Sequence, residues 1–171
     1  AIEVAAGECV SLMGRNGMGK TTTIRTIMGQ LPLQSGQISR FGIHHQDMES
    51  FEIARAGIGL VPEGRQIFSN LSVAENLNTF FRPAAASNET EWTFARVLNL
   101  FPALQNRLDH SGIQLSGGEQ QMLAIGRALI TNPKLLILDE ATEGLAPIIR
   151  EQIWKCLTQL KQAGQSILVV D

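Results

Sequence analysis

Short apolar runs recur along the chain and predict strands that are buried on both faces. They cover residues 9–13, 58–61, 135–138 and 166–170. Apolar runs without polar alternation are typical of parallel strands that helices cover on both sides. A shorter strand between turns is predicted within residues 36–42, where glycine stands at both ends. Strands that alternate with helical segments indicate an α/β fold with a mainly parallel sheet.

Start and stop signals place the helices between these strands. Ser72 and Ser116 are good N-cap residues, Pro147 suits the first turn of a helix, and Gly164 suits the position after a helix end. The helices predicted in this way cover residues 21–28, 50–56, 73–78 and 147–163. Two more helices are predicted: one follows Asn88 and runs to Phe101, where Pro102 ends it, and the other follows Ser116. Residues 83–88 are predicted to form a loop, and no internal repeat is visible.

Composition fits one globular domain. The 171 residues are 44% hydrophobic, which is enough for a core, and the net charge of −2 gives no electrostatic footprint for nucleic acid. No apolar stretch approaches the roughly 20 residues that span a bilayer, and no signal-peptide pattern opens the sequence. Cys9 and Cys156 lack metal or redox spacing, and Cys9 is expected to be a small core residue. His44 and His45 are expected to be polar loop residues.

The first candidate for chemistry fits the pattern G-x-x-x-x-G-K-[ST] and follows the first apolar run. Its residues are Gly14, Arg15, Asn16, Gly17, Met18, Gly19, Lys20, Thr21 and Thr22. A strand before this motif and a helix after it are the context that a phosphate-binding loop requires. The glycines let successive backbone N–H groups point at a phosphate, Lys20 supplies a cation for the β and γ oxygens, and the Thr21 hydroxyl suits Mg²⁺. The alternative is a Gly-rich turn with a solvated lysine.

Two carboxylates end the apolar run at 135–138. Open α/β sheets bind their ligands at the carboxyl ends of the strands, where Asp139 and Glu140 stand. Asp139 is predicted to hold Mg²⁺, directly or through water, and Glu140 to position and polarise an attacking water. The alternative is that these two acidic residues only make the edge of the sheet soluble, which is common at strand ends.

A third motif precedes the helix that follows Ser116. It consists of Leu115, Ser116, Gly117, Gly118, Glu119 and Gln120, followed by a second glutamine. The two glycines expose backbone N–H groups at a helix start, where the helix dipole favours an anion. Taken alone, the segment could equally be an ordinary capped helix.

The three motifs, in this order and spacing, resemble the ATP-binding-cassette (ABC) family over the whole chain. The resemblance implies a P-loop (RecA-like) core at 1–62 and 116–171 and a mostly helical subdomain at 64–115. It also implies that ATP and Mg²⁺ bind at the phosphate loop and are hydrolysed with Glu140 and Lys20 as catalytic residues. Residues 115–120 would be the family's signature, which caps the γ-phosphate of the ATP held by a second subunit of a homo- or heterodimer.

Further residues narrow the resemblance to one part of the family. The runs at 61–68 (Val-Pro-Glu-Gly-Arg-Gln-Ile-Phe) and 144–147 (Gly-Leu-Ala-Pro) resemble ATPase subunits of importers for branched-chain amino acids. The Thr-Glu-Gly run at 142–144 is more similar to the related importers for urea and short amides. Glu63 stands where most of the family has the Q-loop glutamine, and it is expected to lie near Mg²⁺ and to link the core to the helical subdomain. Ala146 replaces the usual D-loop aspartate, and Ala141 replaces a proline.

The helical subdomain is expected to dock on a permease in the membrane. Its charges balance: Arg65, Arg82, Arg96 and Arg107 against Glu75, Glu89, Glu91 and Asp109. A neutral helical surface suits a protein partner better than nucleic acid or lipid headgroups. The resemblance therefore implies a subunit on the cytoplasmic face of the plasma membrane, served indirectly by a periplasmic or extracellular solute-binding protein.

Two other functions share the same motifs. A soluble ABC ATPase in translation or DNA maintenance would carry them too, although Lys20 and Ser116 are too close in sequence to enclose the long coiled coil of the DNA-repair type. A regulatory cassette that only binds ATP usually loses the catalytic glutamate, whereas Glu140 is present. The chain is also expected to be cut at both ends, within an edge strand at Ala1 and before the family's switch residue after Asp171. The adenine-stacking aromatic and the switch residue would then lie outside it.

Overall fold

A computed structural model describes residues 1–44, 48–84 and 91–171, except for the side chain of His44. Four parallel strands form the central sheet in the order β1-β6-β5-β4. They are β1 (Cys9–Leu12), β6 (Ser166–Val170), β5 (Leu135–Asp139) and β4 (Ile58–Val61). A separate antiparallel pair consists of β2 (Ser39–Arg40) and β3 (Ile43–His44). The predicted apolar runs therefore all became strands of one parallel sheet.

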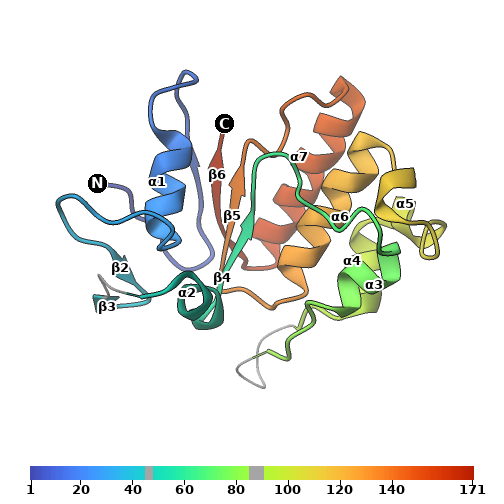
Figure 1. Ribbon diagram of the computed structural model, residues 1–171, viewed down its shortest axis with the longest axis horizontal. Coiled ribbons are helices and arrows are strands. Elements are labelled where there is room, and N and C mark those ends of the chain that lie inside the picture. The colour runs from blue at the N-terminus through green and yellow to red at the C-terminus, as the bar shows by residue number, and fades with distance from the viewer. Residues whose placement is uncertain (45–47, 85–90) are drawn as a thin grey trace.

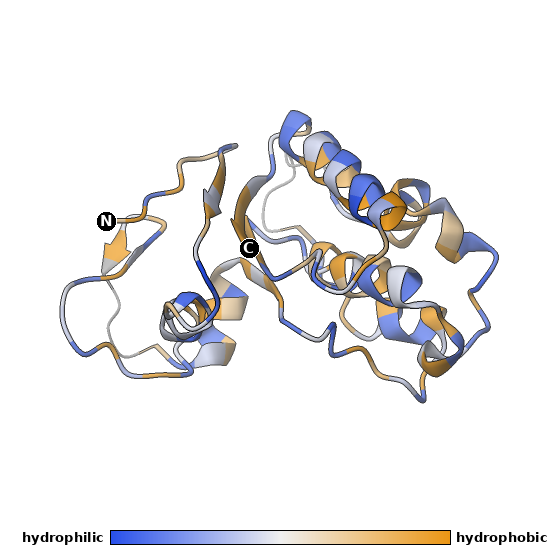
Figure 2. Ribbon diagram, turned by 90° about the horizontal axis from the view of Figure 1, so that it is seen from above, coloured by the Kyte–Doolittle hydropathy of each residue, from blue (hydrophilic) through white to orange (hydrophobic). Residues whose placement is uncertain are grey.

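Helices cover both faces of this sheet (Figure 1). On one side lie α1 and α2, and on the other lie α3 to α7. Their bounds are α1 (Lys20–Ile27), α2 (Ser50–Ala56), α3 (Val73–Asn78), α4 (Phe94–Leu100), α5 (Pro102–Gln105), α6 (Gly117–Leu129) and α7 (Pro147–Gln162), with a short 3₁₀ helix at Gly112–Gln114. Figure 2 shows hydrophilic and hydrophobic residues on the same helices, as expected for helices that cover a sheet and face solvent.

Alternate residues of the buried strands supply two separate cores. In β5, Leu136 and Leu138 pack with the larger set of helices, whereas Ile137 packs with Ile24 of α1 and Ile53 of α2. All five side chains are 0–1% exposed. Successive side chains of a strand point to opposite faces, so an unbroken apolar run is what a sheet covered on both sides requires.

Local capping signals act as predicted at three helices. The Ser72 and Ser116 hydroxyls accept hydrogen bonds from backbone N–H groups three residues on, and a glutamate there bonds back to the N-cap N–H. Pro147 opens α7, and Gly164 follows its end with φ of 85°, in the left-handed region that glycine adopts at no steric cost.

Four expectations need correction. The helix expected after Asn88 begins at Phe94, because the Thr93 side chain caps it; Asn88 itself lies outside the described residues, as do His45 and Glu89. Pro102 starts α5 as well as closing the helix before it, since proline fits the first turn. The strand expected within 36–42 shrinks to Ser39–Arg40, and residues 1–5 form no strand.

Among the described helices, none is long and apolar enough to cross a membrane.

Candidate nucleotide site

The phosphate loop lies between the end of β1 and the start of α1. Gly17 and Gly19 have φ of 83° and 86°, and a Cβ at either position would meet nothing within 4 Å. Both glycines are therefore needed for backbone conformation, and the space beside them is open. Gly19 is the left-handed N-cap of α1, so the loop leads directly into the positive end of that helix. This geometry suits an anion held by backbone N–H groups.

Lys20 is the buried cation of this loop. Its side chain is 8% exposed, and its ammonium donates hydrogen bonds to the Gly14 carbonyl and, at 3.5 Å, to Asn16 Oδ1. Both acceptors belong to the loop itself, and Lys20 forms no ion pair within the described part of the chain. A buried ammonium that has only neutral partners is well placed to neutralise a phosphate.

Asp139 closes β5 next to this loop. It is 4% exposed, and its Oδ1 is buried without a hydrogen-bond partner among the described residues. Burial raises the pKa of its carboxyl, the negative charge of Glu63 adds to the rise, and a hydrogen bond with the Thr21 side chain opposes it. An orphaned carboxylate oxygen beside a threonine hydroxyl is a donor set that fits Mg²⁺.

Glu140 belongs to a second carboxylate group. Its φ is 51°, and its carboxylate lies within 4.8 Å of those of Glu63 and Glu143. Its pKa rises to about 7, chiefly through a hydrogen bond with Glu143; burial and the charges of Glu143 and Glu63 add to the effect. A carboxyl with a pKa near 7 is well matched to general acid–base work at neutral pH.

The predicted signature forms the N-terminus of α6. Glu119 N donates to Ser116 Oγ at 3.3 Å, and Ser116 N donates to Glu119 Oε2 at 2.8 Å. Arg107 pairs with the other oxygen of Glu119 at 3.3 Å. A Cβ on Gly118 would lie 2.8 Å from Ile149 of α7, so glycine is required by packing there. The segment is therefore a capped and closely packed helix start.

The structure brings some predicted residues together and keeps others apart. Lys20, Thr21, Glu63, Asp139 and Glu140 gather at the carboxyl ends of the strands, as the electrostatic neighbours of Asp139 and Glu140 indicate. In contrast, no hydrogen bond or ion pair among the described residues joins the phosphate loop to residues 115–120. In the part of the chain that the structure describes, no polar contact therefore joins the two halves of the predicted site.

Two residues of the site, Glu143 and Arg65, were part of longer runs in the sequence but were not predicted to be site residues. Glu143 hydrogen-bonds Glu140, and its position three residues later in a turn was the only available signal. Arg65 donates to Gln120 of the signature helix at 3.3 Å, a contact between residues 55 positions apart that no local pattern announces.

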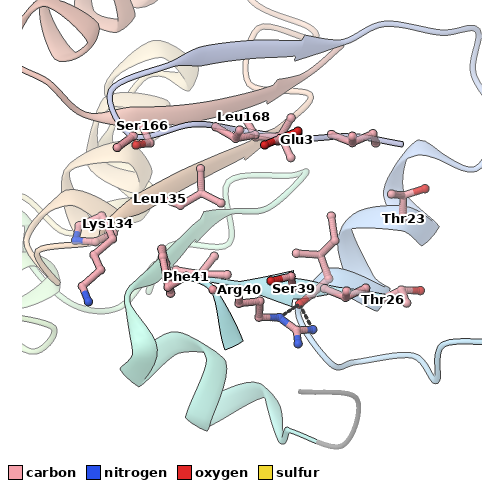
Figure 3. Close-up of a pocket in the computed structure, with 18 of the residues that line it drawn as sticks. Glu3, Thr23, Thr26, Ser39, Arg40, Phe41, Lys134, Leu135, Ser166 and Leu168 are labelled. Carbon is pink, nitrogen blue, oxygen red and sulfur yellow. Dashed lines mark hydrogen bonds between the residues drawn. The ribbon is translucent and has the colours of Figure 1, made fainter. Parts of the chain in front are cut away.

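A large pocket lies beside α1, where Thr22, Thr23 and Thr26 line it. It measures about 1780 Å³, and residues from the N-terminal segment, α1, β2 and the start of β5 line it. Figure 3 shows Thr23 and Thr26 on the α1 side and Arg40 below, where the guanidinium donates two hydrogen bonds to the Ile27 carbonyl at 2.7 and 3.1 Å. Asp139, Glu140 and Lys20 do not line this pocket, so its size is no guide to the nucleotide chemistry.

Comparison with known proteins first defines the fold. The dimeric ABC transporter cassette MJ0796 covers 99% of this chain with a TM-score of 0.79 and 28% identity, and this chain covers 76% of it. A second structure of MJ0796, in a post-hydrolysis state with ADP and Pi, matches with a TM-score of 0.80. The fold is therefore the P-loop nucleotide-hydrolase fold of ABC cassettes.

Sequence comparison then gives the family. Residues 1–143 match the ABC transporter family, and the chain belongs to it. The chain is 44% identical, over its whole length and 73% of the relative's, to the high-affinity branched-chain amino acid transport ATP-binding protein BraG of Pseudomonas aeruginosa. It is 41% identical to the Nod factor export ATP-binding protein I of Rhizobium meliloti, of which it spans 49%. The chain is an ATP-binding ABC ATPase, and its relatives serve more than one transported substrate.

Proposed function

We propose that this chain is the ATP-hydrolysing subunit of an ABC importer for branched-chain amino acids or related small polar solutes. The observation that carries the importer proposal is the 44% identity to BraG over the full chain. The Glu-Gly-Arg run at 63–65 and the Gly-Leu-Ala-Pro run at 144–147 support the same subfamily. A soluble ABC ATPase that serves no permease is the alternative, and the Nod factor relatives favour testing export as well.

In the proposed reaction, each residue of the site has one task. The backbone N–H groups of residues 14–22 cradle the phosphates of ATP, and Lys20 neutralises the β and γ oxygens. Thr21 and Asp139 would hold Mg²⁺, with Glu63 nearby, and the ion supplies charge neutralisation on the phosphates when bound. Glu140 accepts a hydrogen bond from the attacking water and takes its proton as the bond to the γ-phosphorus forms and the bond to the β–γ bridging oxygen breaks.

The active unit is proposed to be a dimer. Residues 115–120 of one subunit, with the Ser116 hydroxyl and the N–H groups at the start of α6, would face the γ-phosphate bound by the other. The partner would be a second copy or a homologous subunit. Residues 64–115 would dock on a membrane-embedded permease, fed by a solute-binding protein outside the cell, which would place the subunit on the cytoplasmic face of the plasma membrane.

Lysine replacement tests the proposed activity. In the full-length subunit, Lys20→Ala should lower the rate of ATP hydrolysis by about 10²–10³, the typical cost of losing one preorganised charge-stabilising donor. Lys155→Ala is the matched control, because Lys155 is 71% exposed and its ion pair among the described residues is with Glu151 one turn away. Hydrolysis by Lys20→Ala within threefold of wild type would rule out the proposed site. Uptake of labelled leucine by cells that carry wild type or Lys20→Ala then separates import from export or a soluble role.

A further inference from the structure

The segment that leaves β4 has an uncommon backbone. Gly64, Arg65 and Gln66 have φ of 75°, 66° and 45°, three left-handed residues in succession. Only glycine adopts this region without strain, so the conformation of Arg65 and Gln66 must be imposed by their surroundings. The carboxylate of Glu63, which lies beside Glu140, directly precedes this segment.

Helix α6 supplies the contacts that hold the segment. Arg65 Nη1 donates to Gln120 Oε1 at 3.3 Å, and Arg127 Nη1 donates to the Gln66 carbonyl at 2.9 Å. Gln120 and Arg127 are seven residues apart, so they lie on one face of α6, two turns from each other. Arg127 is itself fixed over the rings of Phe68 and Phe80 at 4.9 and 4.5 Å. The left-handed segment is thus fastened to one face of the helix that begins with the signature.

Arg65 also packs directly on the signature backbone. A Cβ built on Gly117 would lie 3.2 Å from both Arg65 Nη1 and Nη2, so the guanidinium covers the first residue of α6. Arg65 forms no ion pair among the described residues. A cation at the positive end of a helix is unfavourable when nothing else is present, so helix stability does not explain this placement. An anion brought to the start of α6 would offset that repulsion.

We propose that Arg65 is a positioning residue that holds Ser116, Gly117 and Gly118 in the shape that receives the partner subunit's ATP, and ties this shape to Glu63 at the chain's own nucleotide. This inference rests on the proposed ATP-bridged dimer. Arg65 follows Glu63 by two residues and contacts Gly117 and Gln120. A shift of Glu63 at the ATP bound by its own subunit would therefore move the signature surface that faces the ATP bound by the partner subunit. Arg65 would thereby couple the two ATP sites of the dimer.

The test separates binding in the chain's own site from assembly of the dimer. In the full-length subunit with Glu140→Gln, which is expected to retain ATP, the dimer dissociation constant is measured by sedimentation with saturating Mg-ATP. ATP affinity of the monomer is measured separately with a fluorescent ATP analogue at low protein concentration. Adding Arg65→Gln should weaken the dimer roughly 10- to 100-fold, because the signature of each subunit loses a contact that preorganises it, at both symmetric sites. Monomer affinity for the analogue should change less than twofold.

Two further variants guard against other causes. Gln120→Ala removes the same contact from the other end without changing a residue of the strained segment, although it also removes the bonds that the Gln120 amide donates to the Gly112 and Leu115 carbonyls. It should weaken the dimer in the same direction, and the effects of the two variants should not be fully additive. Arg55→Gln on α2, an exposed arginine stacked on Phe51, is the matched control and should change nothing. If Arg65→Gln leaves the dimer constant unchanged, lowers monomer affinity equally, or adds fully to Gln120→Ala, the inference is wrong. If the parent Glu140→Gln subunit forms no dimer with ATP, the proposed function itself fails.

Discussion

Glu143 controls the protonation of Glu140, and replacing it should change the pH dependence of ATP hydrolysis. The pKa of Glu140 rises to about 7, first because Glu143 shares a hydrogen bond with it. Glu143→Gln keeps the shape but removes a negative charge and turns the shared proton into an amide donor. Both changes favour ionised Glu140, so its pKa should fall toward the ordinary value of 4.5.

The size of the effect follows from the fraction of Glu140 that is ionised. With a pKa of about 7, roughly one carboxyl in ten is ionised at pH 6, whereas a carboxyl with an ordinary pKa is almost fully ionised there. Burial and the charge of Glu63 remain in the variant, so Glu143→Gln should raise kcat/KM for ATP by up to about tenfold at pH 6 and up to about twofold at pH 7, and leave it nearly unchanged at pH 8. The assay is steady-state hydrolysis between pH 5.5 and 8.5, because kcat/KM reports ionisation of the free enzyme.

Stability gives an independent check of the same linkage. Glu140 has a raised pKa in the folded state, so the native protein binds more protons than the unfolded chain between about pH 4.5 and 7. The free energy of unfolding should therefore fall as pH rises through this window, and the raised pKa of Asp139 acts in the same direction. Urea unfolding should show a shallower fall for Glu143→Gln and an unchanged one for Glu151→Gln, whose carboxylate pairs with Lys155 in solvent. If kcat/KM of Glu143→Gln falls on the acid side at the same pH as kcat/KM of the wild type, the reasoning is refuted.

Two further predictions concern the joint between core and helices. Glu63→Gln should leave basal ATP hydrolysis nearly intact but raise the Mg²⁺ concentration for half-maximal activity and change permease-stimulated activity, because a carboxylate favours Mg²⁺ more than an amide does. If basal hydrolysis instead collapses like that of Glu140→Gln, Glu63 is a catalytic residue. Asn76 is fully buried, accepts from Phe68 N and donates to three carbonyls, so Asn76→Ala should lower the free energy of unfolding by about 2–3 kcal/mol in urea titration. Exposed Asn78→Ala should stay within about 0.5 kcal/mol, and equal effects of both variants would contradict this role for Asn76.

Features that depend on near neighbours were predictable from the sequence. Ser72, Ser116, Pro147 and Gly164 act within one helical turn, so their residue types alone indicate where helices begin and end. Pro102 shows the limit of such signals, since proline fits both the residue after one helix and the first turn of the next. The motifs themselves were equally visible, because each depends on a short run.

Features that depend on the assembled sheet could not be predicted. The order β1-β6-β5-β4 brings the end of β4 beside the end of β5, and only this places Glu63 near Asp139 and Glu140. The contact of Arg65 with Gln120 likewise requires the packing of α6 on the segment after β4. These residues lie far apart in the sequence, and no periodicity or spacing encodes their approach.

The dimeric state of the Glu140→Gln subunit with ATP tests the central claim most directly. Without the carboxylate that is proposed to activate water, ATP should bind and persist, and the signature of each subunit should hold the nucleotide of the other. Light scattering after size exclusion should give a dimer with Mg-ATP and a monomer with Mg-ADP. Adding Ser116→Glu should abolish the dimer, because a carboxylate would face the γ-phosphate, while ATP still binds the monomer. A Glu140→Gln subunit that stays monomeric at every ATP concentration, or that still turns ATP over at the wild-type rate, would contradict the account.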